Sequence, residues 1–473
     1  MPQPNIVWIY CDELRADALG CYGNSQFQPR TPYLDLLARM GSRFDACYCN
    51  SPVCVPSRTS VLTGLYPERT GVYHNEACWH DWQSPTSPMT LPQYLVEQAG
   101  YITANFGKVH TPQDMDIWQH SNLEGGGMRE YYGLATEEEL DYFRPPGITP
   151  VIGGRFPGDR PYPAEKVTEN ALSFMAEAQE PYFARLSYLQ PHTPVFPRPP
   201  YDTMYDDVPF RDYVDIPDTL SRFESRFGEV VGSHDMTAGQ IRRAQAAYYG
   251  LVGWIDEQVG QVISFLRKRG ELENTIIVFG ADHGCSLGEA GRYQKQTFAR
   301  ASQRVPRIIA WPGRLKAGVE RTDVCESLDM ARTLCGMLGV TPHEQFQGRD
   351  LFSDAEPEAV YSTIGFGHAS SRAFPNLGAG DFDYGKGWPR RACIRTQRYR
   401  LDKSIRQDGQ MLGPDQADLF LIDRESDPEE NVNRAADPAY ADVIAHLNGL
   451  LDAHLVEHIE VPEELVLRKH ARG

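Results

Sequence analysis

The sequence has no long apolar run and no excess of basic residues. No uninterrupted apolar stretch among its 473 residues reaches the roughly 18 residues of a membrane-spanning helix. The formal net charge of −18 argues against nucleic acid, because proteins that bind it usually present a basic surface. We therefore expect neither a membrane nor a nucleic acid as a partner.

The sequence also lacks the features of an exported, disulfide-linked protein. Its N-terminal segment has no basic region and reaches Asp12 and Glu13 after a short apolar run, unlike a signal peptide. Without an export signal, the ten cysteines are expected to stay reduced. We predict a cytoplasmic protein with mostly free thiols, and we leave open whether it forms a homo-oligomer.

What the sequence does contain is an alternation of short apolar runs and helical patterns. This alternation is typical of an α/β fold, a mostly parallel sheet flanked by helices on both faces. The expected strands are 5–11, 102–108, 182–190 and 274–284, and the expected helices include 32–40, 56–64 and 237–269.

The pattern changes after about residue 370. A glycine-rich connection leads to segments 391–402 and 417–425, which resemble antiparallel strands, and a final helix is expected over about 438–456. We predict a catalytic domain over residues 1–370 and a small C-terminal α+β subdomain over residues 371–473.

Polar residues gather where the expected strands end. Asp12 and Glu13 follow the first strand, and Asp282 and His283 follow the last. Ligands of parallel sheets collect at this edge. Three carboxylates and an imidazole would repel or compete there unless a cation lay among them, and such a donor set suits Ca²⁺, Mg²⁺ or Mn²⁺. The alternative, in which these are ordinary acids that cap neighbouring helices, stays open.

Cationic and imidazole side chains follow other strand ends. Lys108 and His110 are two residues apart and would share a face on a continued strand. With His192 and Lys295, they would suit an anionic tetrahedral group, with histidine available for proton transfer. Each of the four taken alone is also consistent with a solvated surface residue.

The segment CVPSRTSVLTG places Cys54 just before an expected helix. Three interpretations of this cysteine remain open from the residues alone. It is a buried structural thiol, a thiolate nucleophile activated by the helix and Arg58, or a zinc ligand with Cys47 and Cys49. Zinc is disfavoured, because the cysteine spacing fits no common zinc pattern.

The Cys54-x-Pro56-x-Arg58 pattern resembles the signature of type I sulfatases, in which this cysteine is oxidised to formylglycine. Further segments resemble other motifs of that family in the family's order. They are NIVWIYCDELRAD, GKVH, QPHTPVFP, ADHGCSLGEAGRYQKQTFARASQRVPRIIAWPG and LFLIDRESDPEENVN. The resemblance implies an alkaline-phosphatase-like fold, hydrolysis of a sulfate ester and a formylglycine-generating enzyme as a partner.

The resemblance also implies roles for individual residues. The residues implied to hold one divalent cation, Ca²⁺ before Mn²⁺ or Mg²⁺, are Asp12, Glu13, Cys54 as formylglycine, Asp282 and His283. Lys108 and Lys295 would hold the sulfuryl group, and Arg58 the formylglycine hydrate. His192 would protonate the leaving alcohol and His110 would deprotonate the hydrate. Asn75 would contact the sulfate or the metal.

Two positions depart from the usual pattern of the family. Glu13 stands where many members have a second aspartate, and His283 stands where many have asparagine. The histidine resembles choline sulfatases and phosphonate monoester hydrolases, so a phosphonate monoester or phosphodiester hydrolase is the alternative function. Lys108 and His110 favour a sulfatase, because the phosphonate hydrolases have neutral residues there. A non-catalytic, metal-stabilised binding protein is a further alternative.

Overall fold

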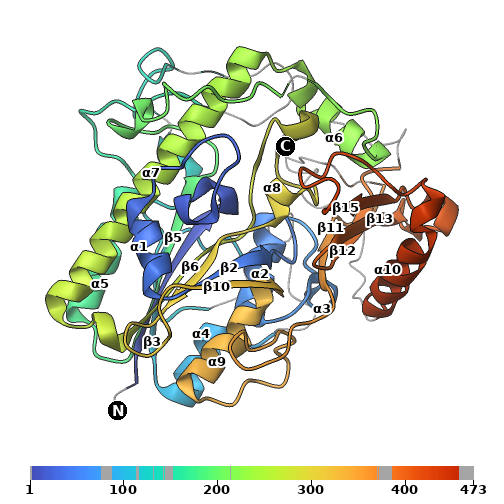
Figure 1. Ribbon diagram of the computed structural model, residues 1–473. Coiled ribbons are helices and arrows are strands. Elements are labelled where there is room, and N and C mark those ends of the chain that lie inside the picture. Colours follow the sequence, from blue (N-terminus) through green and yellow to red (C-terminus); the bar gives the residue numbers. More distant parts are fainter. Residues whose placement is uncertain are drawn as a thin grey trace.

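An eight-stranded sheet forms the centre of the computed structural model (Figure 1). The structure describes residues 3–75, 88–112, 117–131, 133–141, 143, 153–213, 215–369, 371 and 386–456. The strand order is β10-β2-β9-β6-β1-β5-β3-β4. The strands are β1 (Asn5–Asp12), β2 (Ser42–Tyr48), β3 (Ile102–Gly107), β4 (His120–Asn122), β5 (Tyr182–Pro191), β6 (Thr275–Ala281), β9 (Arg307–Ala310) and β10 (Val319–Glu326). Every neighbouring pair is parallel except the two that involve β9, which confirms the expected mostly parallel sheet.

Helices cover both faces of this sheet (Figure 1). One face carries α1 (Pro32–Met40), α5 (Glu165–Glu177) and α7 (Ala238–Arg269). The other carries α2 (Cys54–Thr63), α4 (Leu91–Ala99) and α9 (Met330–Leu338). All residues of β1 and β6 are therefore buried, which explains why both read as continuous apolar runs.

The long helix α7 shows how local sequence sets an element's ends. Thr237 and Gln240 form a capping box at its start, so unpaired N–H groups of the first turn gain partners. Gly270 ends the helix with a φ of 72°, a left-handed conformation that glycine adopts without steric cost. The helix expected over 237–269 is thus confirmed, with Thr237 as its cap.

A second, antiparallel sheet lies beside the first (Figure 1). It contains β11 (Val360–Ile364), β12 (Arg390–Arg395), β13 (Tyr399–Gln407), β14 (Gln410–Met411) and β15 (Phe420–Asp423), and α10 (Ala441–His454) packs on it. Its first strand precedes residue 370, where the sequence suggested a boundary. The division into domains at that residue stays a prediction.

The two sheets are linked by contacts from a long segment that follows β6. This segment contains the hairpin strands β7 (Ser286–Leu287) and β8 (Tyr293–Gln294) and the short helix α8 (Arg300–Gln303). The remaining short helices are α3 (Pro67–Thr70) and α6 (Arg222–Val231). In the part of the chain that the structure describes, no helix has both the length and the apolar character needed to cross a membrane.

Three boundaries differ from the sequence-based expectation and matter for the site. The helix α2 begins at Cys54 itself, because Val53 is already extended and serves as the cap position. The strand β6 ends at Ala281, directly before Asp282. The strand β3 ends at Gly107, so strand alternation does not continue through Lys108 to His110, whose φ is 54°.

Candidate active site

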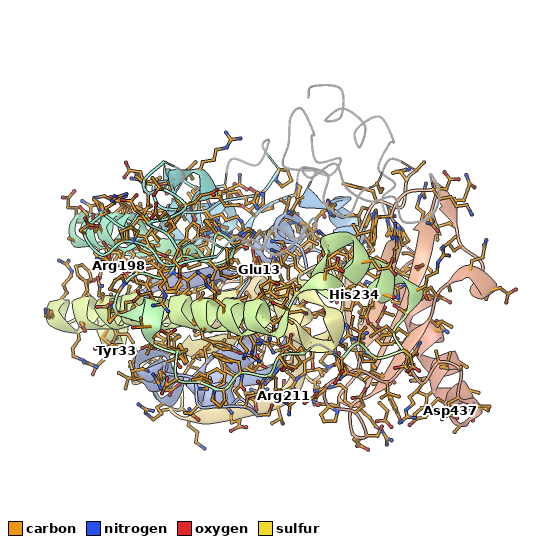
Figure 2. All side chains as sticks on the ribbon, turned by 90° about the horizontal axis from the view of Figure 1, so that it is seen from above. Glu13, Tyr33, Arg198, Arg211, His234 and Asp437 are labelled. Atoms are coloured by element: carbon orange, nitrogen blue, oxygen red, sulfur yellow. The ribbon has the colours of Figure 1, made fainter. Side chains whose placement is uncertain are left out.

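Four neighbouring parallel strands deliver the predicted residues to one edge of the main sheet. In the order β6-β1-β5-β3, Asp282 follows β6, Asp12 ends β1, His192 follows β5 and Lys108 follows β3. Because these strands are parallel, their carboxyl ends meet at the same edge. Glu13, the next residue after β1, lies near the middle of the molecule in Figure 2. The sequence-based prediction of a polar cluster at this edge is confirmed for these residues.

Arg58 bridges the two aspartates of the cluster. Its Nε lies 2.7 Å from Asp282 Oδ2 and its Nη2 lies 3.0 Å from Asp12 Oδ2. Its Nη1 donates to the hydroxyl of Ser187, 2.9 Å away. All three charged side chains are fully buried. The guanidinium favours the ionised form of both acids, although burial and Asp12 leave the pKa of Asp282 raised above its ordinary value, and it sets the distance between the ends of β1 and β6.

Cys54 lies between these carboxylates and the cationic side chains. Its Sγ is 3.5 Å from Asp12 Oδ1, 3.2 Å from His283 Nε2 and 3.2 Å from Lys295 Nζ. Burial and Asp12 raise the pKa of this thiol, but Lys295, Lys108 and His283 lower it by more. The result is a pKa of about 6, below the ordinary 9.0 of a thiol. The surroundings of residue 54 therefore favour negative charge on its side chain.

The two lysines pair with different carboxylates. The Nζ of Lys108 forms an ion pair with Asp12 Oδ2. The Nζ of Lys295 lies 3.3 Å from Glu13 Oε2. Burial lowers the pKa of Lys295, but Cys54 and Glu13 raise it more, so this ammonium stays charged. The site thus presents two ammonium groups to any anion that enters it.

The donor atoms fit a divalent cation. Asp12, Cys54, Asp282 and His283 each offer one ligand atom within 4.8 Å of the others, and Asp12, Glu13 and His192 form a second such group. Arg58, Lys108 and Lys295 already balance the three carboxylates, so repulsion alone does not require a metal. Two observations favour one: buried Glu13 Oε1 has no hydrogen-bond partner among the described residues, and His283 Nε2 faces the carboxylates.

The ring orientations of the histidines support the same conclusion. His283 Nδ1 lies 2.9 Å from the carbonyl oxygen of Gly284 and donates to it, so Nε2 is the ring atom that points at the cluster. Burial lowers the pKa of His283, but Asp282 and Cys54 raise it more, to about 9, so a cation at Nε2 would take the place of a proton. His192 Nδ1 likewise donates to the carbonyl of Thr193, which leaves Nε2 3.4 Å from Glu13 Oε2. Two acceptors at that separation need a proton or a cation between them.

The remaining two predicted residues lie at the margin of the cluster. His110 forms no hydrogen bond or ion pair with the other site residues, and its buried Nδ1 has no hydrogen-bond partner among the described residues. Burial and Lys108 lower its pKa well below 6.5, which keeps the ring neutral. Asn75 accepts a hydrogen bond from the backbone N–H of Val55 at 2.9 Å, so it holds the first turn of α2. Its predicted contact with sulfate or metal stays a prediction.

Residues that sequence analysis did not single out also shape the site. The Ser57 hydroxyl donates a hydrogen bond to the carbonyl of Asp282, and the Ser187 hydroxyl accepts one from Arg58 Nη1. Tyr248 fixes the chain beyond the acids, because its hydroxyl donates to the carbonyl of Glu13 at 2.7 Å. A serine or tyrosine within an apolar element carries no local signal of such a role, so only the fold reveals these contacts.

All nine cysteines within the described residues are free, as the sequence predicted for most of them. Cys47 and Cys49 are buried and belong to neither group of potential metal ligands. The hypothesis of a zinc site built from Cys47, Cys49 and Cys54 therefore gains no support from the described residues.

Comparisons with known proteins agree with this geometry. An arylsulfatase of Clostridium perfringens is 29% identical over 388 residues, covering 74% of this chain and 78% of that protein. An N-acetylglucosamine-6-O-sulfatase of Bacteroides thetaiotaomicron is 27% identical over 414 residues, covering 74% and 70%. The solved phosphonate monoester hydrolase of Agrobacterium radiobacter has a TM-score of 0.76 at 22% identity, with 96% of each chain covered, which shows a shared fold.

A family model described as Sulfatase matches residues 4–340. The matched region contains each of the side chains that meet at the carboxyl edge of the sheet, from Asp12 to Lys295. It also covers more than half of the chain. The chain therefore belongs to the sulfatase family.

Proposed function

We propose that this protein hydrolyses a sulfate ester, whose alcohol is a small molecule, an aryl alcohol or a carbohydrate. The reaction would take place at residue 54, after oxidation of Cys54 to formylglycine. The observation that carries the proposal is the position of Cys54 Sγ, which lies 3.2 Å from both Lys295 Nζ and His283 Nε2. This places one potential nucleophile beside an ammonium group and the potential metal ligands.

The ligands that we propose for one divalent cation are Asp12, Glu13, Asp282, His283 and the modified residue 54. When bound, such a cation would supply Lewis-acid activation of an oxygen nucleophile, and formylglycine would supply that oxygen as an aldehyde hydrate. We propose Ca²⁺, with Mn²⁺ or Mg²⁺ as alternatives, because four of these five ligands offer oxygen.

The chain's own side chains would bind the ester and stabilise charge. Lys108 and Lys295 would hold the sulfuryl oxygens, because both ammonium groups already face acceptors at the site. Arg58 would favour the ionised forms of Asp12 and Asp282 and hold both side chains in place.

Two histidines would move protons. His192 presents Nε2 to the site, the atom that would protonate the leaving alcohol. Burial and Lys295 lower the pKa of His192 well below 6.5, which opposes this role in the free enzyme. An anionic ester between the two side chains would offset Lys295, so substrate binding would restore the proton. His110 is neutral, and its Nδ1 has no hydrogen-bond partner in the described part of the chain, which suits a group that accepts a proton from residue 54.

Phosphonate monoester or phosphodiester hydrolysis is the second candidate. It is favoured by His283 and by the structural likeness to a phosphonate monoester hydrolase. Lys108 and His110 favour the sulfatase. The test is a panel of aryl, choline and carbohydrate sulfates assayed beside a phosphonate monoester and a phosphodiester, with protein of known formylglycine content. Higher kcat/KM for a phosphonate than for every sulfate ester would overturn the proposal.

We further propose that a formylglycine-generating enzyme modifies Cys54 and that the protein acts in the cytoplasm. The free state of the described cysteines supports a reducing compartment.

We also propose residues 1–370 as the catalytic domain and 371–473 as a C-terminal subdomain. Homo-oligomerisation would be tested by sedimentation of the purified protein.

A further inference from the structure

The segment that carries Lys295 has an unfavourable backbone conformation on both sides of the lysine. Gln294 has a φ of 64° and Gln296 a φ of 71°, and neither residue is glycine. Non-glycine residues in this region persist only when their surroundings hold them there. The position of the Lys295 ammonium therefore depends on what anchors residues 292–300.

Part of the anchoring is local. The N–H of Gln296 donates to the carbonyl of Pro52 at 3.0 Å, and Ser302 donates its hydroxyl to the carbonyl of Gln294 at 3.0 Å. Both bonds act close to the lysine. Neither holds the two ends of the segment, Arg292 and Arg300.

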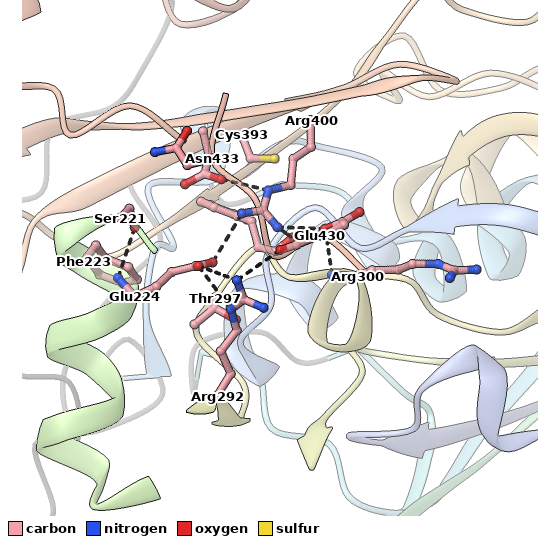
Figure 3. A network of polar contacts seen from close by, with 12 residues as sticks. Ser221, Phe223, Glu224, Arg292, Thr297, Arg300, Cys393, Arg400, Glu430 and Asn433 are labelled. Atoms are coloured by element: carbon pink, nitrogen blue, oxygen red, sulfur yellow. Dashed lines mark hydrogen bonds and ion pairs between the residues drawn. The ribbon is translucent and has the colours of Figure 1, made fainter. Parts of the chain in front are cut away.

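Those two ends are held by Glu430, which lies in the loop between β15 and α10 (Figure 3). The Glu430 carboxylate accepts the backbone N–H of Arg300 at 3.0 Å, and its carbonyl oxygen accepts Arg292 Nη2 at 3.2 Å. Glu430 is fully buried and itself has a φ of 58°. One residue thus contacts both ends of the segment.

Two arginines extend this anchor to the middle of the segment. Arg395 forms two bonds with the Glu430 carboxylate, at 2.6 and 2.9 Å, and Arg400 forms one at 2.7 Å. Both arginines also donate to the carbonyl oxygen of Phe298, at 2.5 and 3.2 Å. Glu224 of α6 completes the network by accepting Arg292 at 2.7 Å and Arg400 at 3.3 Å (Figure 3).

We infer that Glu430 is a positioning residue for Lys295, so that the C-terminal sheet holds the ammonium in place at Cys54. The inference rests on the proposed function for its kinetic test, whereas its structural test does not. Glu430 touches none of the predicted catalytic residues and acts only through the segment 292–300. It lies in the LFLIDRESDPEENVN motif, to which the mechanism assigns no other role.

The kinetic test is a double-mutant cycle. Glu430→Gln keeps the shape but removes the carboxylate that pairs with Arg395 and one of the three that pair with Arg400. We expect it to lower kcat/KM roughly tenfold in the wild-type background and less than about twofold in the Lys295→Ala background. An equal loss in both backgrounds would show that Glu430 acts on stability or on another group, and would overturn the inference.

The structural test is amide hydrogen exchange of residues 293–299. Exchange should speed up in Glu430→Gln and stay unchanged in β1. Unchanged exchange in the segment would overturn the inference, even if no sulfate ester were hydrolysed. Asp423→Asn is the matched control. Asp423 is a buried acid at the end of β15 that bonds to Arg398 and Tyr440, and among the described residues it forms no hydrogen bond or ion pair with residues 292–300. Should Glu430→Gln not fold, Glu430→Asp retains the charge with a shorter reach and serves in both tests.

Discussion

The ammonium of Lys295 lies 3.2 Å from the sulfur of Cys54. At this distance the lysine stabilises negative charge on residue 54 and remains close enough to bind an anion next to it. The same ammonium is 3.3 Å from Glu13, so a ligand that takes up the carboxylate would free the lysine for substrate.

Removal of this ammonium should therefore weaken transition-state stabilisation. We expect Lys295→Ala or Lys108→Ala to cost about 2–4 kcal/mol in kcat/KM with a cognate sulfate ester, as for other lost electrostatic donors. Lys268→Ala, at the exposed end of α7, is the control and should have no effect. A loss below about tenfold in the first two variants would place these lysines outside the reaction.

Mass spectrometry tests the modification of Cys54. Oxidation of the thiol to an aldehyde removes sulfur and should lower the mass of the peptide by about 18 Da. Activity should scale with the modified fraction across preparations, and Cys54→Ala should fold but lose turnover. Cys54→Ser should become trapped as a stable sulfate ester. Equal turnover by fully unmodified protein would contradict the mechanism.

Metal removal tests the cluster of Asp12, Glu13, Asp282 and His283. Chelation should abolish turnover, and Ca²⁺, Mn²⁺ or Mg²⁺ should restore it, with the most effective ion identifying the natural one. Binding of the same ion should also raise the melting temperature, because it would bind the folded state alone. Full activity of metal-stripped protein would rule out a metal requirement.

The pH dependence of stability should report on Glu430. Burial raises the pKa of this carboxyl, but Arg395 and Arg400 lower it more, well below its ordinary 4.5. A lowered pKa stabilises the folded state above 4.5, and this stabilisation is lost as the pH falls below that value. The free energy of unfolding of the wild type should therefore drop on acidification by more than that of Glu430→Gln.

Urea unfolding of both proteins between about pH 6 and about pH 3 measures this difference. The gap between them should be widest at the upper end and shrink toward the lower end, because the unfolded wild-type chain then takes up a proton at Glu430 that the folded chain does not yet bind. A gap that is constant with pH would mean that Glu430 titrates equally in the folded and unfolded chains.

Much of the site could be predicted because its residues immediately follow buried strands. The apolar runs of β1, β5 and β6 mark their own ends, and Asp12, His192 and Asp282 lie at those ends. Parallel strand direction then brings them together whatever the length of chain between them. Both the strand assignments and the gathering of these residues are confirmed.

Other features depend on contacts that no local pattern encodes. The bond between Arg300 N–H and Glu430 joins residues 130 positions apart. Nothing near either residue predicts this pairing, and a glutamate in a polar loop is usually exposed. The antiparallel direction of β9 is not predictable from the sequence for a related reason. The direction of a strand is set by the connection that precedes it, and a short apolar strand has the same composition whether it is parallel or antiparallel.

That reversed strand has a consequence for how the lysine segment can vary. Because β9 pairs antiparallel with β6, with Gly280 opposite Arg307, the chain leaves and re-enters the sheet at the same edge. Residues 282–306 therefore begin and end beside each other, at the carboxyl end of β6. The interior of this segment can therefore vary in length without moving β6 or β9, provided that Lys295 and the bond between Arg300 and Glu430 are kept.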